Sequence, residues 1–199
     1  VVIIGGVAGG ATAAARLRRL DEQAEIVMLE RSGYVSYANC GLPYYVGGVI
    51  TDQEELTLQT PESFRARFDI DVRVRQEAIA IDPEARTVTV RRLDDGSEYI
   101  EGYDKLILSP GARPVMPGLP GEDGELLFTL RTVEDTYRIA DFVERERPRR
   151  VTVVGAGFAL FMTFGNGLNV FTAVIETIMG PGIPADWVLI SLIVLLMLL

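Results

Sequence analysis

Short apolar runs alternate with an amphipathic stretch at the start of the chain. An apolar run at residues 1–4 leads into a glycine-rich turn, an alanine-rich helix over about 11–20 and a second apolar run at 26–29. This strand–helix–strand order is typical of a parallel sheet. The pattern further predicts buried strands at 105–109 and 151–154 and an amphipathic helix at 134–146.

The pattern changes between these elements. Polar and apolar residues alternate at 71–75 and at 87–91, and Asp94-Asp95-Gly96 is a turn signal. We therefore expect an antiparallel β-meander inserted into the parallel fold. The predicted fold class is α/β, a Rossmann-like domain with an inserted antiparallel meander.

Polarity falls sharply near residue 158. Only two charged residues, Glu176 and Asp186, lie beyond position 150, and residues 187–199 contain one polar side chain, Ser191. A membrane span needs roughly 20 apolar residues. We expect 159–199 to be an apolar helical segment, either a membrane-associated or transmembrane helix or a buried core helix. The predicted organisation is a domain at 1–150, the start of a second nucleotide unit at 151–158, and this segment.

Charge and composition exclude several classes of function. The formal net charge of -9 disfavours a nucleic-acid partner. The chain has no histidine, which excludes His-based triads and His-ligated metal sites, and we expect no metal site. No charged segment followed by an apolar stretch opens the chain, so we expect no signal peptide and a cytoplasmic location for residues 1–150.

Glycines cluster where the first apolar run meets the helix. The turn reads Gly5-Gly6-Val7-Ala8-Gly9-Gly10, in the place of a dinucleotide fingerprint, although Val7 stands at the second glycine position. The first glycine suits a tight turn, the last allows the helix to pack on the strand, and the helix N-terminus would bind a pyrophosphate. Glu30 follows Gly10 by 20 residues, where a carboxylate takes the adenosine ribose hydroxyls. These residues predict a nucleotide site.

Cys40 is the single cysteine of the chain, so no internal disulfide can form. It precedes Gly41-Leu42-Pro43 at an expected helix start, and a helix N-terminus favours the thiolate form of a cysteine. With no second cysteine beside it, Cys40 would cycle through a mixed disulfide with a small thiol or through a sulfenic acid.

Residues 1–157 resemble the coenzyme A-disulfide reductase and NADH oxidase family of pyridine nucleotide-disulfide oxidoreductases. The resemblance is carried by residues 1–10, 30, 36–48, 103–114, 128–135 and 151–158. It implies FAD bound by residues 5–10 and Glu30 and closed over by Ser109, Gly111 and Ala112, with NAD(P)H as electron donor. It also implies that Cys40 is the redox centre and that the intact protein is a homodimer. The residues that it implies contact coenzyme A are Thr12, Arg16, Arg19, Ser36 and Asn39.

The resemblance weakens after residue 157. Gly155 and Gly157 look like the opening of an NAD(P)H-binding unit, but Leu160 stands where the third fingerprint glycine belongs. Residues 161–199 faintly resemble the large membrane subunit of tripartite dicarboxylate transporters. We expect a composite chain, in which a reductase fragment precedes a membrane fragment. We prefer this interpretation to a membrane-tethered flavoprotein.

Three functions remain open from the sequence. The first is an FAD-dependent NAD(P)H:disulfide oxidoreductase that reduces coenzyme A disulfide or another small disulfide through Cys40. The second is an NADH oxidase or peroxidase in which Cys40 cycles through sulfenic acid. The third is a non-catalytic FAD-binding or membrane-associated remnant.

Overall fold

The computed structural model describes residues 1–115 and 126–153. These residues belong to two compact units. The first, called the α/β unit, contains Val1–Asn39 and Gln53–Val133. Of the described residues, the second unit contains Cys40–Asp52 and 134–153.

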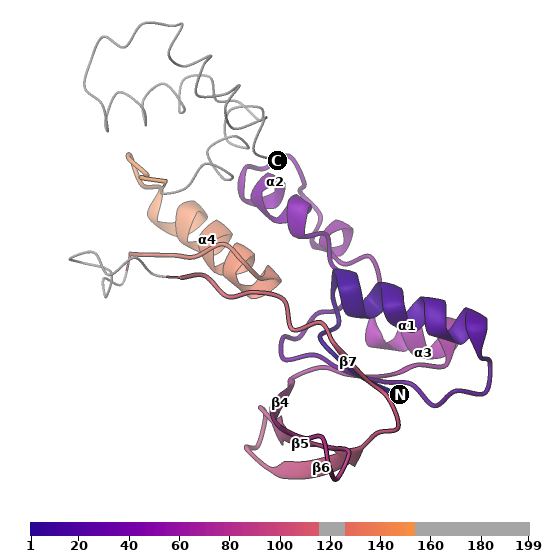
Figure 1. Cartoon of the computed structure of the whole chain (residues 1–199). Helices are drawn as coiled ribbons and strands as arrows, with labels where there is room; N and C mark the ends of the chain where they lie inside the picture. Colours follow the sequence, from indigo (N-terminus) through magenta and orange to yellow (C-terminus); the bar gives the residue numbers. More distant parts are fainter. Residues whose placement is uncertain (116–125, 154–199) are drawn as a thin grey trace, which may run out of the picture. The chain divides into compact units, whose positions relative to one another are not determined.

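A four-stranded parallel sheet forms the centre of the α/β unit (Figure 1). Its strands lie in the order β3-β2-β1-β7, and every neighbouring pair is parallel. Helix α1 (Ala8–Leu20) connects β1 to β2, which confirms the predicted strand–helix–strand start. The strands are β1 (Val2–Ile4), β2 (Val27–Leu29), β3 (Asp71–Arg73) and β7 (Leu106–Leu108).

The antiparallel meander is confirmed, but its first strand differs from the prediction. It consists of β4 (Gln76–Asp82), β5 (Thr87–Arg92) and β6 (Glu98–Gly102), with the predicted turn between the last two. The alternating residues at 71–75 instead supply β3, at the edge of the parallel sheet. An edge strand with two different faces alternates in polarity just as a meander strand does, so the pattern alone does not distinguish them.

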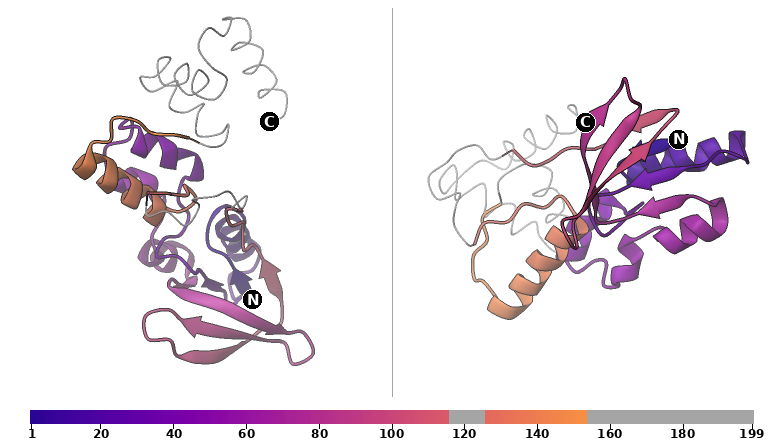
Figure 2. Two further views of the ribbon diagram at one scale, coloured as in Figure 1. Left: turned by 90° about the vertical axis from the view of Figure 1, so that its left-hand side faces the viewer. Right: turned by 90° about the horizontal axis from the view of Figure 1, so that it is seen from below.

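Strands β1, β2 and β7 each place alternate side chains on two separate cores. Ile3 and Met28 face helices α1 and α3, where they pack in a cluster with Ala14. Val2 and Leu29 face the meander and pack against Val88 and its neighbours. Figures 1 and 2 show the resulting layers: helices on one side of the parallel sheet and the three-stranded meander on the other.

The remaining helices are short except for the predicted one near 134–146. Helix α3 (Pro61–Phe68), which sequence analysis did not predict, starts with a capping box between Thr60 and Ser63. In the second unit the Tyr45 ring of α2 meets the Tyr137 ring of α4 edge to face at 5.6 Å. The other elements are η1 (Asn39–Gly41), α2 (Leu42–Val46), η2 (Gln53–Leu56) and α4 (Val133–Glu146).

Two predictions for the end of the chain have different outcomes. The predicted strand at 151–154 is not formed by residues 151–153, where no described strand offers a pairing neighbour, and Val154 lies outside the described residues. The apolar segment at 159–199 also lies outside them. Within residues 1–115 and 126–153, no helix combines the length and apolar character needed to cross a membrane.

Candidate functional site

The glycine-rich turn follows β1 directly and is shaped by its contacts with β2 and β7. Gly5 has a φ of +98°, which an L side chain rarely adopts, and its N–H donates to the Leu29 carbonyl at 2.8 Å. A Cβ atom at Gly5 would overlap the Ser109 carbonyl oxygen. The position therefore requires glycine for both conformation and space.

Two further glycines let the first turn of α1 approach its neighbours. A Cβ atom at Gly10 would overlap the Gly5 carbonyl oxygen, and one at Gly9 would overlap Ser109 Oγ. The helix thus rests against the turn and the end of β7. Val7, at the position of the missing fingerprint glycine, has a φ of -98°. This φ is negative, so Val7 does not lie in the left-handed region that favours glycine.

The N-terminus of α1 carries no side-chain cap. Its N-cap residue, Val7, offers no oxygen to the first-turn N–H groups, and the first turn contains no acidic residue. Ala8 and Gly9 are both exposed. A helix start with uncapped N–H groups and no nearby carboxylate in its first turn is suited to a negatively charged ligand.

Glu30 links the end of β2 to the glycine turn. Its Oε2 accepts a hydrogen bond from the Gly6 N–H at 2.7 Å, and its Oε1 accepts one from the Ser32 N–H at 2.8 Å. A carboxylate has about four acceptor positions, so two remain for hydroxyl donors. The half-buried side chain is thereby held in one orientation beside the turn.

The backbone of Glu30 is fixed by the next two strands. Its N–H donates to the Arg73 carbonyl at 2.9 Å, and its carbonyl accepts from the Gln76 N–H at 3.0 Å. Arg73 ends β3, and Gln76 begins β4. The predicted ribose carboxylate therefore lies where the parallel sheet and the meander meet.

The loop after β7 extends the same edge of the sheet. The Ser109 N–H donates to the Ile4 carbonyl at 2.7 Å, and Gly111 has a φ of +70°. Arg131, which sequence analysis did not single out, donates from Nε to the Ala112 carbonyl at 3.1 Å. This contact ties residues 111–112 to the chain leading into α4.

Ser36 and Asn39 lie on the segment that follows β2. The Ser36 N–H donates to the Gly6 carbonyl at 2.9 Å, and the φ of Ser36 is +48°, an uncommon value for a residue with a side chain. The Asn39 Oδ1 atom is buried and accepts no hydrogen bond from the described residues. A buried amide oxygen without a donor is costly unless a ligand or water satisfies it.

The basic face predicted on α1 is present but open. Thr12, Arg16 and Arg19 are all exposed and recur at four and three residues along the helix. Arg18, not predicted as important, instead holds α1 to α3: its Nε donates to the Phe68 carbonyl at 2.7 Å and its Nη2 to the Asp69 carbonyl at 2.8 Å.

Cys40 belongs to the second unit and is exposed. It lies in η1, and helix α2 begins two residues later at Leu42 with Gly41 as its N-cap. The helix start expected after Cys40 is therefore present, although α2 has only 5 residues. Gly155 and Gly157 of the predicted second nucleotide unit lie outside the described residues.

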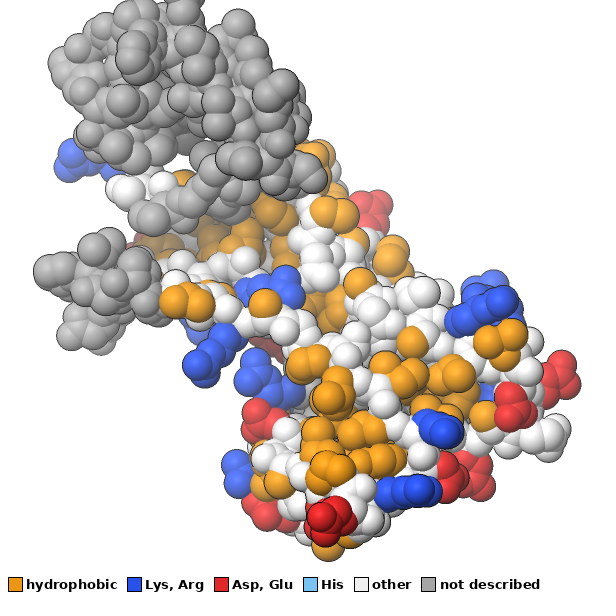
Figure 3. All heavy atoms as spheres, in the orientation of Figure 1, with side chains coloured by type: hydrophobic (Ala, Val, Ile, Leu, Met, Phe, Trp, Pro, Cys, Tyr) orange, Lys and Arg blue, Asp and Glu red, His pale blue; other side chains and the backbone are white. Residues whose placement is uncertain are grey.

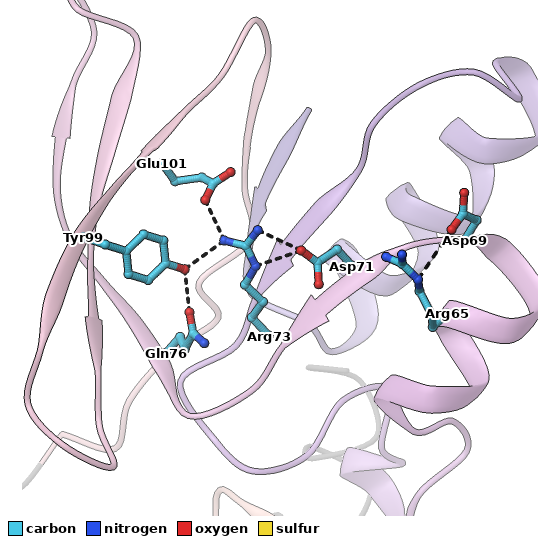
Figure 4. A network of polar contacts seen from close by, with 7 residues as sticks. All are labelled: Arg65, Asp69, Asp71, Arg73, Gln76, Tyr99 and Glu101. Carbon is cyan, nitrogen blue, oxygen red and sulfur yellow. Dashed lines mark hydrogen bonds and ion pairs between the residues drawn. The ribbon is translucent and has the colours of Figure 1, made fainter.

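A polar network joins β3 to the meander (Figure 4). Arg73 donates to Asp71 Oδ2 from Nε at 2.9 Å and to Glu101 Oε2 from Nη1 at 2.6 Å. Burial by itself would lower the pKa of Arg73, but hydrogen bonds to Glu101, Tyr99 and Asp71 outweigh it and raise that pKa. The guanidinium group is therefore a permanent cation bridging the two sheets.

The described surface is also hollowed beside α3. A shallow depression of about 690 Å³ lies beside α3 and is lined by Pro61, Glu62, Arg65 and residues that follow the helix. It is remote in sequence from the glycine turn and contains none of the predicted site residues. Acidic and basic side chains are interspersed over the face of the α/β unit shown in Figure 3, without one continuous basic area.

Comparison with known proteins identifies a family for most of the chain. The family profile described as pyridine nucleotide-disulphide oxidoreductase matches residues 1–159. A coenzyme A disulfide reductase of Staphylococcus haemolyticus is 39% identical over 174 residues, covering 85% of this chain and 39% of the relative. One of Staphylococcus aureus strain MSSA476 is 43% identical over 158 residues, 79% of this chain and 35% of the relative.

Solved structures show the same fold. The reduced Bacillus anthracis CoADR-RHD has a TM-score of 0.78 and 46% identity, covering 88% of this chain and 30% of that one. A NAD-dependent persulfide reductase of A. fulgidus has a TM-score of 0.69 and 37% identity, covering 72% and 27%. The chain spans between 35% and 39% of the length of the curated relatives named above. From the profile match and these relatives, the chain belongs to the pyridine nucleotide-disulphide oxidoreductase family.

Proposed function

We propose that this chain is the flavin-binding part of an FAD-dependent NAD(P)H:disulfide oxidoreductase that reduces coenzyme A disulfide through Cys40. The family uses FAD with NAD(P)H as the electron donor. The observation that carries the proposal is the assembly of Gly5, Gly10, Glu30 and Ser109 at one edge of the parallel sheet. At that edge, crevices beyond the carboxyl ends of the strands bind dinucleotides.

The residues at this edge fit FAD. The uncapped start of α1 would hold the pyrophosphate, since its N–H groups have no side-chain acceptor from Val7. The overlaps that a Cβ atom would make at Gly5, Gly9 and Gly10 require glycine there, which keeps the turn and the start of α1 close together and close to Ser109. The free acceptor positions of the Glu30 carboxylate would take the adenosine ribose hydroxyls.

Ser109, Gly111 and Ala112 would close the other side of the cofactor. The Arg131 contact with the Ala112 carbonyl supports this role, because it fixes the loop after β7 in place. Bound FAD would supply the two-electron relay between NAD(P)H and sulfur. The protein's own part is to orient the cofactor and to present the thiol.

Cys40 would act on the disulfide. Its thiolate attacks one sulfur of coenzyme A disulfide, a Cys40–coenzyme A disulfide forms, and one coenzyme A thiolate leaves. Two electrons from NAD(P)H then cleave the mixed disulfide, restoring the Cys40 thiolate and releasing the second coenzyme A after protonation. The exposure of Cys40 and the orphaned Oδ1 of its neighbour Asn39 support a ligand at this position.

Thr12, Arg16 and Arg19 would contact the coenzyme A. Their exposed, one-sided placement on α1 is suited to phosphate, which Arg binds through a planar pair of donors. In the intact protein, residues 151–158 would begin the NAD(P)H unit and a homodimer would complete the site. The membrane-associated role of 159–199 stays a prediction.

Two measurements on the purified 199-residue chain test the proposal. Titration with FAD should shift the visible flavin spectrum and saturate at one FAD per chain. Incubation with coenzyme A disulfide should then yield one mixed-disulfide adduct, located on Cys40 by peptide mass spectrometry. Free flavin in the presence of folded protein would overturn the FAD site. An adduct formed only by peroxide, as a sulfenic acid, would favour the oxidase or peroxidase alternative.

A further inference from the structure

Glu30 is one of four residues that hydrogen bonds link into a ring. Its N–H donates to the Arg73 carbonyl at 2.9 Å, and its carbonyl accepts from the Gln76 N–H at 3.0 Å. The side chains of those two residues meet again at Tyr99. Arg73 Nη1 donates to Tyr99 Oη at 3.0 Å, and Tyr99 Oη donates to Gln76 Oε1 at 2.5 Å.

The other three residues of the ring lie on three strands, no two of which are neighbours in one sheet. Arg73 ends β3 of the parallel sheet, Gln76 begins β4, and Tyr99 lies on β6. Figure 4 shows the tyrosine hydroxyl between the guanidinium group and the amide. The Tyr99 hydroxyl thus fixes the spacing of Arg73 and Gln76, which both form hydrogen bonds with the backbone of Glu30.

Tyr99 itself has little freedom to move. Its ring packs in the apolar cluster around Val88 and Val90. Guanidinium groups lie near its ring, that of Arg92 at 4.5 Å and that of Arg73 at 5.7 Å from the centroid. Glu101, next but one along β6, holds Arg73 from the same strand. The hydroxyl is therefore presented from a rigid strand.

We infer that Tyr99, through its hydrogen bonds to Arg73 and Gln76, is a positioning residue for Glu30 in FAD binding. The inference rests on the proposed function, because it assigns the ring to the cofactor that Glu30 would hold. The Glu30 carboxylate must keep the Gly6 and Ser32 N–H groups on one side and offer its other acceptor positions to ribose hydroxyls. A shift of the Glu30 backbone would misdirect those positions, as loosened supporting contacts do at binding sites.

The test is a double-mutant cycle on FAD affinity in the full chain. Tyr99→Phe removes the hydroxyl and keeps the ring. It should raise the FAD dissociation constant about three- to tenfold, the effect of one lost hydrogen bond. In a Glu30→Gln background the same change should have less than about a twofold effect, because the carboxylate that it positions is gone. Gln76→Met, which removes the other side of the ring, should behave like Tyr99→Phe.

The control is Tyr103→Phe, because Tyr103 packs in the same apolar cluster and is not part of the ring. It should leave FAD affinity unchanged. Equal losses of affinity for Tyr99→Phe in both backgrounds would show a general structural effect and overturn the inference. An unchanged FAD affinity in Tyr99→Phe would also overturn the inference, provided that wild type binds FAD and that Glu30→Gln binds it weakly. If wild type itself binds no FAD, the proposed function fails as well, which separates the two failures.

Discussion

The Glu30 carboxylate accepts a hydrogen bond from the Gly6 N–H at 2.7 Å, across the gap between the end of β2 and the glycine turn after β1. The two residues are 24 positions apart in the sequence. The contact links the element expected to bind the pyrophosphate with the one expected to bind the ribose. Substitutions on either side of it should therefore change cofactor affinity in a measurable way.

Replacing the Glu30 carboxylate should weaken FAD binding. Glu30→Gln keeps the size of the side chain but removes the charge that strengthens hydrogen bonds to ribose hydroxyls. Hydrogen bonds to charged groups contribute about 1.5–3 kcal/mol, so the dissociation constant should rise roughly ten- to hundredfold. Isothermal titration of the full chain with FAD measures it. Glu77→Gln is the matched control, since the Glu77 carboxylate pairs with Arg31 at 3.6 Å. Unchanged affinity in Glu30→Gln would contradict the assignment.

A methyl group at Gly10 should disrupt the site. Gly10→Ala would push α1 away from the Gly5 carbonyl and cost about 1–3 kcal/mol of unfolding free energy, together with FAD binding. Gly102→Ala is the control, because no atom lies within 4 Å of a Cβ there. Urea unfolding and FAD titration of both variants check the prediction. Equal behaviour of the two variants would mean that the close approach of α1 is not needed.

Cys40 should carry all thiol chemistry of the chain, because it is the single cysteine. After incubation with coenzyme A disulfide, the wild-type chain should gain one coenzyme A by intact mass and lose it again with dithiothreitol. Cys40→Ser should gain none while retaining FAD, since the glycine turn is unchanged. If wild-type protein with a titratable thiol forms no adduct, Cys40 does not attack this disulfide.

Reduction by NAD(P)H should be slow in the 199-residue chain. Leu160, which lies outside the described residues, occupies the position expected for the third glycine of a second fingerprint, where a side chain would separate helix from strand. Hydride transfer needs reacting atoms within about 3–3.5 Å, so a distorted donor site should lose most of the rate. Anaerobic mixing of the FAD-loaded chain in detergent with NADH or NADPH, followed at the flavin absorbance, measures it. Dithionite should still bleach the flavin, whereas rapid bleaching by NAD(P)H would refute the role of Leu160.

The local pattern predicted much of the fold because short-range signals specify it. Residues 1–29 contain a complete strand–turn–helix–strand signal, and the structure forms it with the glycines in contact with Ser109. The placement of β3 was wrong, because pairing partners depend on distant residues that local alternation does not reveal. Helix α3 was not predicted, although Thr60-Pro61 and Ser63 form a start signal that could have indicated it.

The site shows the same division between local and distant information. Glu30 was identified from its spacing alone, and its contact with Gly6 agrees with that placement. Arg131 and Tyr99 were not identified from the sequence, because each acts through a partner that is 19 or more positions away. No periodic pattern or short motif encodes such a contact. Their importance becomes visible only when the meander and the loop after β7 are in place.

The pairing of β1 with β7 has a consequence for how the chain acquires its structure. Ile3 and Ile107 are register partners, so β1 keeps one edge unpaired until the chain has been synthesised through β7. Parallel pairing of strands so far apart in the sequence is slow, because the ends of the long intervening loop must meet before any stabilising contact forms. A nascent chain stopped before Leu108 would expose an apolar strand edge, which is a template for aggregation. We therefore expect the α/β unit to fold cooperatively only after β7, the last parallel strand among the described residues, has been added.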